Sequence, residues 1–235
     1  MIDDEKITKF DANNDPAKLA RIGTYVTKRL SSNRLVQQVE HDDAQVYIYQ
    51  GFLGPSDCKM LIRKIDAEAV PSSLYKGTEQ PGFRTSYSCH LSRWDYDVGR
   101  VEARMSDTLG IENDYAETMQ GQRYQAGQEF KSHHDFFHPS QNYWLDEGPA
   151  GGQRSWTAMI FLNEPEGGGN TEFPHLGIGV KPQAGMMLIW NNMSPDGTMN
   201  YKTLHAGTPI TKGVKHIITK WYRQNNWLEL TTPKS

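Results

Sequence analysis

Cysteine is scarce in this chain of 235 residues, which contains only Cys58 and Cys89. The two residues do not form a Cys-x-x-Cys pair, and this spacing argues against a zinc site or a redox motif. A disulfide framework is also disfavoured, because a single possible pair would have to stabilise a long chain. We therefore expect two free thiols in a reducing compartment.

An excess of basic residues is missing as well. The chain has 25 Lys and Arg against 28 Asp and Glu, which gives a formal net charge of -3. Proteins that bind nucleic acid by neutralising phosphates carry a positive excess, so we expect no nucleic-acid partner.

Long apolar runs are absent too. No run reaches the roughly 18 residues of a membrane span, and the acidic residues 1–5 do not resemble a secretory signal. We expect a cytoplasmic protein with no membrane partner, and the composition leaves its oligomeric state open.

Hydrophobic residues make up 37% of the chain and aromatic residues 11%, enough for a core and for a pocket lined with rings. The first 44 residues are polar, and Asp15-Pro16 predicts the start of a helix in an N-terminal arm. From Gln45 onward the composition changes from mainly polar to rich in β-forming residues. Residues 46–49 are rich in β-formers and predict a strand, and Ser56 is a plausible N-cap for a following helix.

Short runs of β-forming residues alternate with turns in the rest of the chain, and helices are expected mainly before about residue 120. This pattern predicts a β-sandwich or jelly roll, hence a mainly β protein with flanking helices in the α+β class. We divide the chain into an arm or helix at 1–44, a domain at 45–228 and a tail at 229–235. The clearest strand-like runs are 156–162, 184–190 and 216–222.

His133 and Asp135 form the first half of a candidate metal site. Residues two apart on a strand point the same way, so these side chains share a face while His134 points to the other. His205 is a candidate third ligand from elsewhere in the chain. Two histidines and one carboxylate leave half of the coordination sphere open, as in non-haem Fe(II) oxygenases.

Lys215 follows His205 by ten residues, across a segment that reads as a strand end and a turn. The two side chains would lie on neighbouring strands, which suits a dicarboxylic acid held by a metal at one end and an ammonium at the other. Lys215 shares its strand face with Trp221, and a buried lysine without an anion would be costly. These residues therefore predict an anionic ligand beside the metal.

Residues 124–135 read Tyr-x-x-Gly-x-x-Phe-x-x-His-x-Asp, and this motif resembles the metal motif of the prolyl 4-hydroxylase family of Fe(II)/2-oxoglutarate-dependent dioxygenases. Single motifs of this kind have low specificity, but their order and number are specific. The resemblance covers roughly residues 46 to 225. Further stretches that agree with it are 84–86, 151–154, 168–174, 181–185 and 204–221.

The resemblance implies a double-stranded β-helix core and an enzyme that hydroxylates prolyl residues, at carbon 4, in a peptide or protein. It implies Fe(II), 2-oxoglutarate and O2 as cofactors, ascorbate as a reductant, and release of succinate and CO2. The site residues that it implies are His133, Asp135 and His205 for iron, Lys215, Tyr124, Thr171 and Trp221 for the cosubstrate, and Arg154 with Arg84, in a mobile loop, for the substrate.

The sequence departs from the family at His134, where an aromatic or apolar residue is common, and in the long aromatic segment 136–150, which would form a lid or a substrate wall. Both departures concern the substrate rather than the iron. Hydroxylation of a free amino acid or another small molecule therefore stays open as an alternative, and a non-catalytic binding module is the remaining one.

Overall fold

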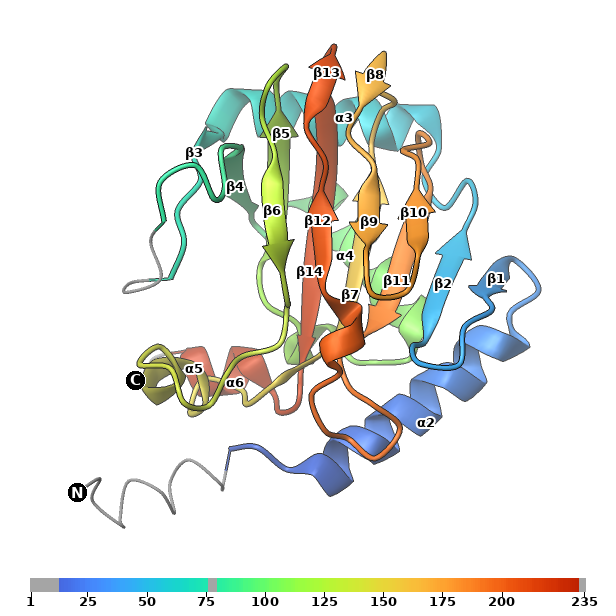
Figure 1. Ribbon diagram of the computed structural model, residues 1–235, viewed down its shortest axis with the longest axis vertical. Coiled ribbons are helices and arrows are strands. Elements are labelled where there is room, and N and C mark those ends of the chain that lie inside the picture. Colours follow the sequence, from blue (N-terminus) through green and yellow to red (C-terminus); the bar gives the residue numbers. More distant parts are fainter. Residues whose placement is uncertain (1–12, 76–79, 233–235) are drawn as a thin grey trace.

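The structure is a computed structural model that describes residues 13–75 and 80–232. Two β-sheets face each other, and helices cover the outer side of the larger sheet (Figure 1). The acidic residues 1–5 and the last residues of the expected tail lie outside the described residues. The expected class, mainly β with flanking helices and a jelly-roll core, is confirmed.

The larger sheet is antiparallel, and its central strands are the three apolar runs predicted from the sequence. Over the described residues its strand order is β1 (Val36–Val39), β2 (Val46–Tyr49), β11 (Met187–Asn191), β7 (Arg154–Phe161), β14 (Lys215–Arg223), β5 (Met119–Tyr124), β4 (Tyr87–Leu91) and β3 (Val70–Pro71).

The smaller sheet lies in front of the larger one in Figure 1 and carries the candidate metal ligands. Its order is β10 (Ile178–Val180), β9 (Thr171–Phe173), β12 (His205–Gly207) and β6 (Phe130–His133). A two-stranded ribbon joins β13 (Ile210–Lys212) to β8 (Gly167–Gly168). The triple glycine at 167–169 thus belongs to a strand and its turn.

Side chains of the central strands alternate between two apolar layers. On β14, Ile218 and Tyr222 belong to the layer between the larger sheet and the helices, whereas Ile217 belongs to the layer between the two sheets. On β7, Ile160 and Phe161 divide in the same way. Because the period of a strand is two, the face of β14 that carries Ile217 also directs Lys215 between the sheets.

Three long helices precede residue 120, as predicted. They are α2 (Pro16–Ser32), α3 (Pro55–Glu68) and α4 (Tyr96–Leu109). After residue 120 the described helices are short: α5 (Trp144–Glu147), α6 (Trp227–Thr231) and the 3-10 turn η2 (Tyr201–Thr203). Another 3-10 turn, η1 (Asn113–Tyr115), follows α4. None of the helices in the described residues is both long and apolar enough to cross a membrane.

The two long helices nearest the N-terminus start at proline. Asp15 caps α2, since its carboxylate accepts the Lys18 backbone N–H at 2.9 Å, and this confirms the predicted helix start. Ser56 was wrong as the N-cap of α3, because that helix begins at Pro55 after Gly54. The fixed φ of proline suits the first helical position, so the N-cap is Gly54, two residues earlier than predicted.

Helix α2 packs on the larger sheet through one face, with Val26 and Leu30 fully buried in the layer under the helices. Strand β1 follows and extends the same sheet by pairing with β2. The described part of residues 1–44 thus contributes both a helix and an edge strand. Both cysteines are buried and free, as expected.

Leu30→Ala should lower the free energy of unfolding by about 2–5 kcal/mol, because it removes a fully buried side chain and leaves a cavity. Lys28→Ala, at an exposed position of the same helix, should change it by no more than about 0.5 kcal/mol. Urea denaturation of both variants measures the difference. Equal stability of the two variants would show that α2 does not pack on the sheet.

Candidate metal centre and its two cavities

The metal candidates meet because β6 and β12 pair side by side. Their antiparallel register places His205 directly opposite His133. Asp135 lies just beyond the end of β6, two residues after His133, and turns toward both imidazoles. One ligand atom from each residue lies within 4.8 Å of the others, so the three side chains could hold a metal ion.

Backbone carbonyls fix the orientation of both imidazoles. Nδ1 of His133 lies 2.8 Å from the Lys131 carbonyl oxygen, and Nδ1 of His205 lies 3.0 Å from that of Thr203. Each Nδ1–H therefore donates to a carbonyl, and the unprotonated Nε2 faces Asp135. Both Nε2 atoms lie 3.8 Å from the Asp135 Oδ1. Three lone-pair donors thus converge on one point.

Asp135 is held by a chain of two buried hydrogen bonds. Thr157 on β7 donates its hydroxyl to the Asp135 Oδ2 at 2.7 Å, and the Asn192 amide donates to the Thr157 hydroxyl at 2.9 Å. The second carboxylate oxygen is occupied in this way, so Oδ1 is the one that faces the imidazoles. Partners of this kind orient metal ligands and tune their affinity.

The protonation states at the site suit a cation. Burial, together with the neighbouring His205, lowers the pKa of His133 to about 3. For Asp135, burial acts to raise the pKa, but His205, His133 and Arg154 outweigh it and hold the pKa below its usual value. At neutral pH the site therefore presents a neutral His133 beside an ionised Asp135, which is the state that a divalent metal requires.

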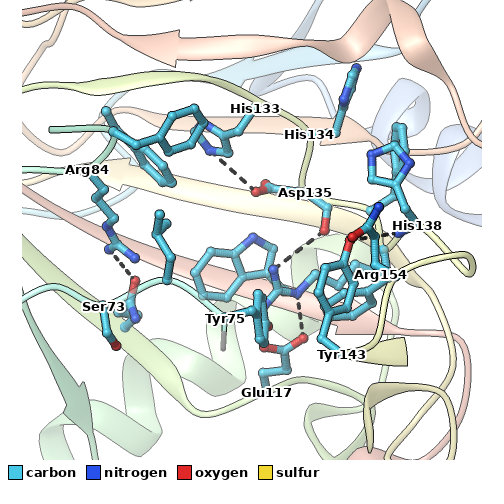
Figure 2. A pocket seen from close by; sticks show the side chains of 18 of the residues that line it. Ser73, Tyr75, Arg84, Glu117, His133, His134, Asp135, His138, Tyr143 and Arg154 are labelled. Carbon is cyan, nitrogen blue, oxygen red and sulfur yellow. Dashed lines mark hydrogen bonds and ion pairs between the residues drawn. The ribbon is translucent and has the colours of Figure 1, made fainter. Parts of the chain in front are cut away.

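His134 points away from the candidate ligands, as the period of two predicts. Its ring stacks on Phe136, with centroids 4.5 Å apart, and its Nε2 lies 3.2 Å from the Tyr201 carbonyl oxygen. In Figure 2 it is turned away from Asp135, while His133 faces that carboxylate.

A narrow cavity of about 40 Å³ begins at the three candidate ligands and runs between the two sheets. Lys215, Ile217, Thr219 and Trp221 all line it, which confirms the predicted shared face of β14. The four residues that the sequence assigned to cosubstrate binding, Lys215, Tyr124, Thr171 and Trp221, are all among its walls.

Lys215 is 2% exposed, and its ammonium donates to the Gly169 carbonyl oxygen at 2.7 Å. Burial lowers the pKa of this lysine to about 7. The rings of Tyr124 and Phe161 lie 5.6 and 5.2 Å from its Nζ. An ammonium has three donors, so a single carbonyl leaves it able to bind an anion in the cavity.

Two polar residues of this cavity, Gln122 and Thr219, were given no role in the sequence analysis. The Tyr124 hydroxyl donates to Gln122 Oε1 at 2.7 Å, and Gln122 donates from Nε2 to the Thr219 hydroxyl at 3.1 Å. The strand period of two could have identified both residues. Gln122 shares a strand face with Tyr124, two residues away, and Thr219 shares one with Lys215, four residues away.

A larger cavity of about 780 Å³ opens on the other side of the candidate ligands. His133, Asp135, Phe130 and Trp221 border both cavities, so the metal candidates lie at their junction. Arg154 and Arg84, the two residues predicted for the substrate, line the larger cavity (Figure 2).

Arg154 is already bound to a carboxylate. Its guanidinium grips Glu117 through Nε and Nη2 at 2.6 and 2.7 Å, and it donates from Nη2 to the Tyr75 hydroxyl at 2.8 Å. Burial acts to lower the pKa of Arg154, but Glu117 outweighs it and raises the pKa, so the charge is permanent. Arg154 Nη1 also reaches the Asp135 carbonyl at 3.5 Å (Figure 2).

Arg84 lies across the cavity from Arg154. It donates to Gln120 Oε1 at 2.8 Å, and its guanidinium lies 4.9 Å above the Phe130 ring. The backbone around Arg84 is bonded to the edge of β6, through Thr85 N to Glu129 O at 3.1 Å and Lys131 N to Phe83 O at 3.0 Å. Residues 83–85 are thus hydrogen-bonded to the neighbouring strand, and a mobile loop in the region 84–86 stays a prediction.

The segment 136–150 forms one wall of the larger cavity, through Phe136, Phe137, His138 and Tyr143. Of the two roles left open by the sequence, the structure shows the wall. Glu117 and Tyr75 also line this cavity and were missed. No pattern indicated them, because both lie in irregular segments whose partners are distant in sequence.

Comparison with known proteins gives the family. A family model described as the 2OG-Fe(II) oxygenase superfamily matches residues 119–223. Probable prolyl 4-hydroxylase 3 of Arabidopsis thaliana is 30% identical over 205 residues, which cover 76% of this chain and 69% of that protein. Prolyl 4-hydroxylase 5 of the same plant is 29% identical over 246 residues, covering 90% and 82%.

Solved structures agree. The viral collagen prolyl hydroxylase of Paramecium Bursaria Chlorella virus-1, in its 2OG complex, superposes with a TM-score of 0.58 at 25% identity, covering 82% of this chain and 97% of that one. A prolyl hydroxylase of Trichoplax adhaerens shares the fold, with a TM-score of 0.59 at 15% identity over 92% and 95%. The chain belongs to the prolyl 4-hydroxylase family of 2OG-Fe(II) oxygenases, which confirms the resemblance seen in its motifs.

Thr157→Val should weaken binding of Fe(II), or of Mn(II) as its stand-in, by roughly 10- to 100-fold, because Asp135 loses the hydrogen bond that orients it. Ser155→Ala is the matched control. Ser155 lies on the same strand as Thr157, but its hydroxyl donates to the Tyr222 carbonyl of β14 rather than to a candidate ligand. Anaerobic metal titration measures both variants. Unchanged affinity in Thr157→Val would contradict the proposed orientation of Asp135.

Proposed function

We propose that this protein hydroxylates prolyl residues, at carbon 4, in a peptide or protein substrate, using Fe(II), 2-oxoglutarate and O2 and releasing succinate and CO2. One observation carries the proposal: the candidate ligands His133, Asp135 and His205 lie where a narrow cavity that contains the Lys215 ammonium meets a wide cavity lined by aromatic rings. A small cosubstrate and a large substrate can therefore reach the same point from two sides.

The candidate ligands fit iron. Two imidazole Nε2 atoms lie 3.8 Å from one carboxylate oxygen, and a cation bound among these three atoms would be held by all of them. Two histidines and one carboxylate on one side leave the opposite positions free. With 2-oxoglutarate and O2, iron held there would supply the oxidant for a substrate C–H bond by oxidative decarboxylation of the cosubstrate.

The narrow cavity carries the polar groups that would bind 2-oxoglutarate. We assign Lys215 to the distal carboxylate, because its buried ammonium retains donors that point into the cavity. The Thr171 hydroxyl would add a hydrogen bond, the Tyr124 hydroxyl would turn from Gln122 to add another, and the indole of Trp221 would flank the cosubstrate. Burial raises the pKa of Tyr124, so its hydroxyl stays a neutral donor at physiological pH.

The wide cavity fits an extended, proline-rich chain. Proline-rich segments bind aromatic grooves because their backbone is preformed in the polyproline II conformation. Tyr75, Phe137, Tyr143 and Trp221 supply such a surface. Arg84 and Arg154 would contribute to substrate binding from two sides of this groove, with Arg154 held in place by Glu117.

Hydroxylation of a free amino acid remains the second candidate function, since it would use the same metal site. The size of the larger cavity, about 780 Å³, favours the peptide. An enclosed pocket matched to one amino acid would be much smaller than this groove.

Succinate formation with proline-rich peptides, compared with free proline, tests the proposal. Fe(II), 2-oxoglutarate and ascorbate as reductant complete the assay. We expect peptide-stimulated succinate release and a mass gain of one oxygen on a prolyl residue of the peptide. Stimulation by free proline alone would favour the amino-acid hydroxylase, and stimulation by neither would overturn both.

The affinity for 2-oxoglutarate should fall as the pH rises above about 7. The free protein has a Lys215 pKa of about 7, so the lysine is increasingly neutral above that pH. A bound carboxylate needs the ammonium, and binding therefore takes up a proton. Linkage then reduces the affinity by up to about tenfold per pH unit.

Calorimetry at pH 6.5 and 8.5, in buffers of different ionisation enthalpy and with Mn(II) in place of iron, measures this proton uptake. Lys215→Met should bind 2-oxoglutarate more weakly and should lose the pH dependence. Equal affinity for the cosubstrate in Lys215→Met and in the parent protein would refute the assignment of Lys215.

A further inference from the structure

Phe137, two residues beyond Asp135, is held between two arginines. The guanidinium carbon of Arg154 lies 4.7 Å from its ring centroid, and that of Arg223 lies 4.6 Å from it. Arg223 is 1% exposed and comes from the end of β14. Guanidinium groups stack favourably on aromatic faces, and more so away from water. The ring therefore has little freedom to move.

The backbone of Phe137 is fixed independently by Gln153. The side-chain amide of Gln153 accepts the Phe137 N–H at 2.9 Å and donates to the Phe137 carbonyl oxygen at 2.7 Å. Gln153 is fully buried. These two bonds are like those that a neighbouring strand would make to Phe137, and they fix the backbone at the start of the segment 136–150.

Arg223 also holds the far end of the same segment. From Nη1 it reaches Glu117 Oε1 at 2.9 Å and Glu147 Oε2 at 2.8 Å, and Glu147 lies in α5. Glu117 is the carboxylate that Arg154 grips. Two carboxylates and two guanidinium groups thus alternate through Glu147, Arg223, Glu117 and Arg154, from the segment to the cavity.

The members of this network divide into two groups. Arg223, Gln153 and Glu147 do not line the larger cavity, whereas Phe137 and Tyr143 do. Tyr75, on the opposite side, contacts both rings, with centroids 5.6 Å from Phe137 and 5.2 Å from Tyr143. The position of these cavity rings therefore depends in part on the charges of Arg223 and Glu147, which do not line the cavity.

We propose that Arg223 is a positioning residue, which through Glu147 and Phe137 holds the segment 136–150 closed as a rigid wall of the substrate cavity before any peptide binds. This inference rests on the proposed function, and it names the structural device that prepares the cavity for the peptide. A preformed wall reduces the ordering that binding requires. Its loss should therefore weaken peptide binding more than it slows the chemical step.

Two variants separate this role from a general role in folding. Arg223→Met keeps an unbranched aliphatic stem but removes both ion pairs, while Glu117 keeps its pairing with Arg154. Glu147→Gln removes only the outer pair, at a side chain that is 22% exposed, and should fold normally. Asp57→Asn is the matched control, because Asp57 pairs with Arg100 and Arg104 between α3 and α4, away from both cavities.

We expect Glu147→Gln to raise the KM for a proline-rich peptide by about tenfold, and Arg223→Met by more. The kcat should change less than threefold, and the KM for 2-oxoglutarate should not change. Amide hydrogen exchange within residues 137–150 should accelerate in both variants without substrate. Asp57→Asn should alter neither the exchange of this segment nor the peptide KM.

Unchanged exchange and unchanged peptide KM in Arg223→Met and Glu147→Gln would overturn the inference. Equal effects of Asp57→Asn and Glu147→Gln would also overturn it, because they would reveal a general loss of stability. Arg223→Lys adds a graded case, since a point charge cannot hold both carboxylates as a guanidinium does. A parent protein without peptide-stimulated succinate formation would instead refute the proposed function, so the two failures are distinguishable.

Discussion

The pairing of β6 with β12 is the constraint on which the rest of the site depends. It places His205 opposite His133, and the period of the strand then brings Asp135 to the same side. A slip of one residue in this register would turn His134 toward the site and His133 away from it. The apolar layer between the sheets opposes such a slip, because Phe130 on β6, which packs against that layer, would move away from it.

Buried charge is arranged differently on the two sides of the candidate ligands. In the narrow cavity Lys215 has a carbonyl but no carboxylate partner among the described residues, and its lowered pKa reflects the cost of burial. Around the wide cavity Arg154 and Arg223 are matched by Glu117 and Glu147. The Lys215 charge is available for an anionic ligand, whereas the charges of Arg154 and Arg223 are satisfied internally and serve as a scaffold. Such a difference is consistent with a cosubstrate bound by charge and a peptide bound by shape and aromatic contact.

The sequence predicted the elements that depend on local patterns. The central strands followed from runs of β-formers, and the meeting of His133, Asp135 and His205 followed from strand period and motif spacing. The start of α3 was placed at the wrong residue, because Ser56 was weighed as a cap without the preference of Pro55 for the first helical position. Glu117 was not predicted, since its partners Arg154 and Arg223 lie 37 and 106 residues away and no local pattern links them. The role of the segment 136–150 was open for the same reason: its aromatic content was visible, but the charges that anchor it were not.

X-ray absorption at the iron edge, on the protein loaded anaerobically with Fe(II), examines the central claim most directly. We predict that the iron has two imidazole ligands and one carboxylate ligand. Water should fill its remaining coordination positions, and 2-oxoglutarate should replace water when it is added. Replacement of His205 should reduce the imidazole count from two to one. A first shell with fewer than two imidazoles in the parent protein, or one that does not change when 2-oxoglutarate is added, would contradict it.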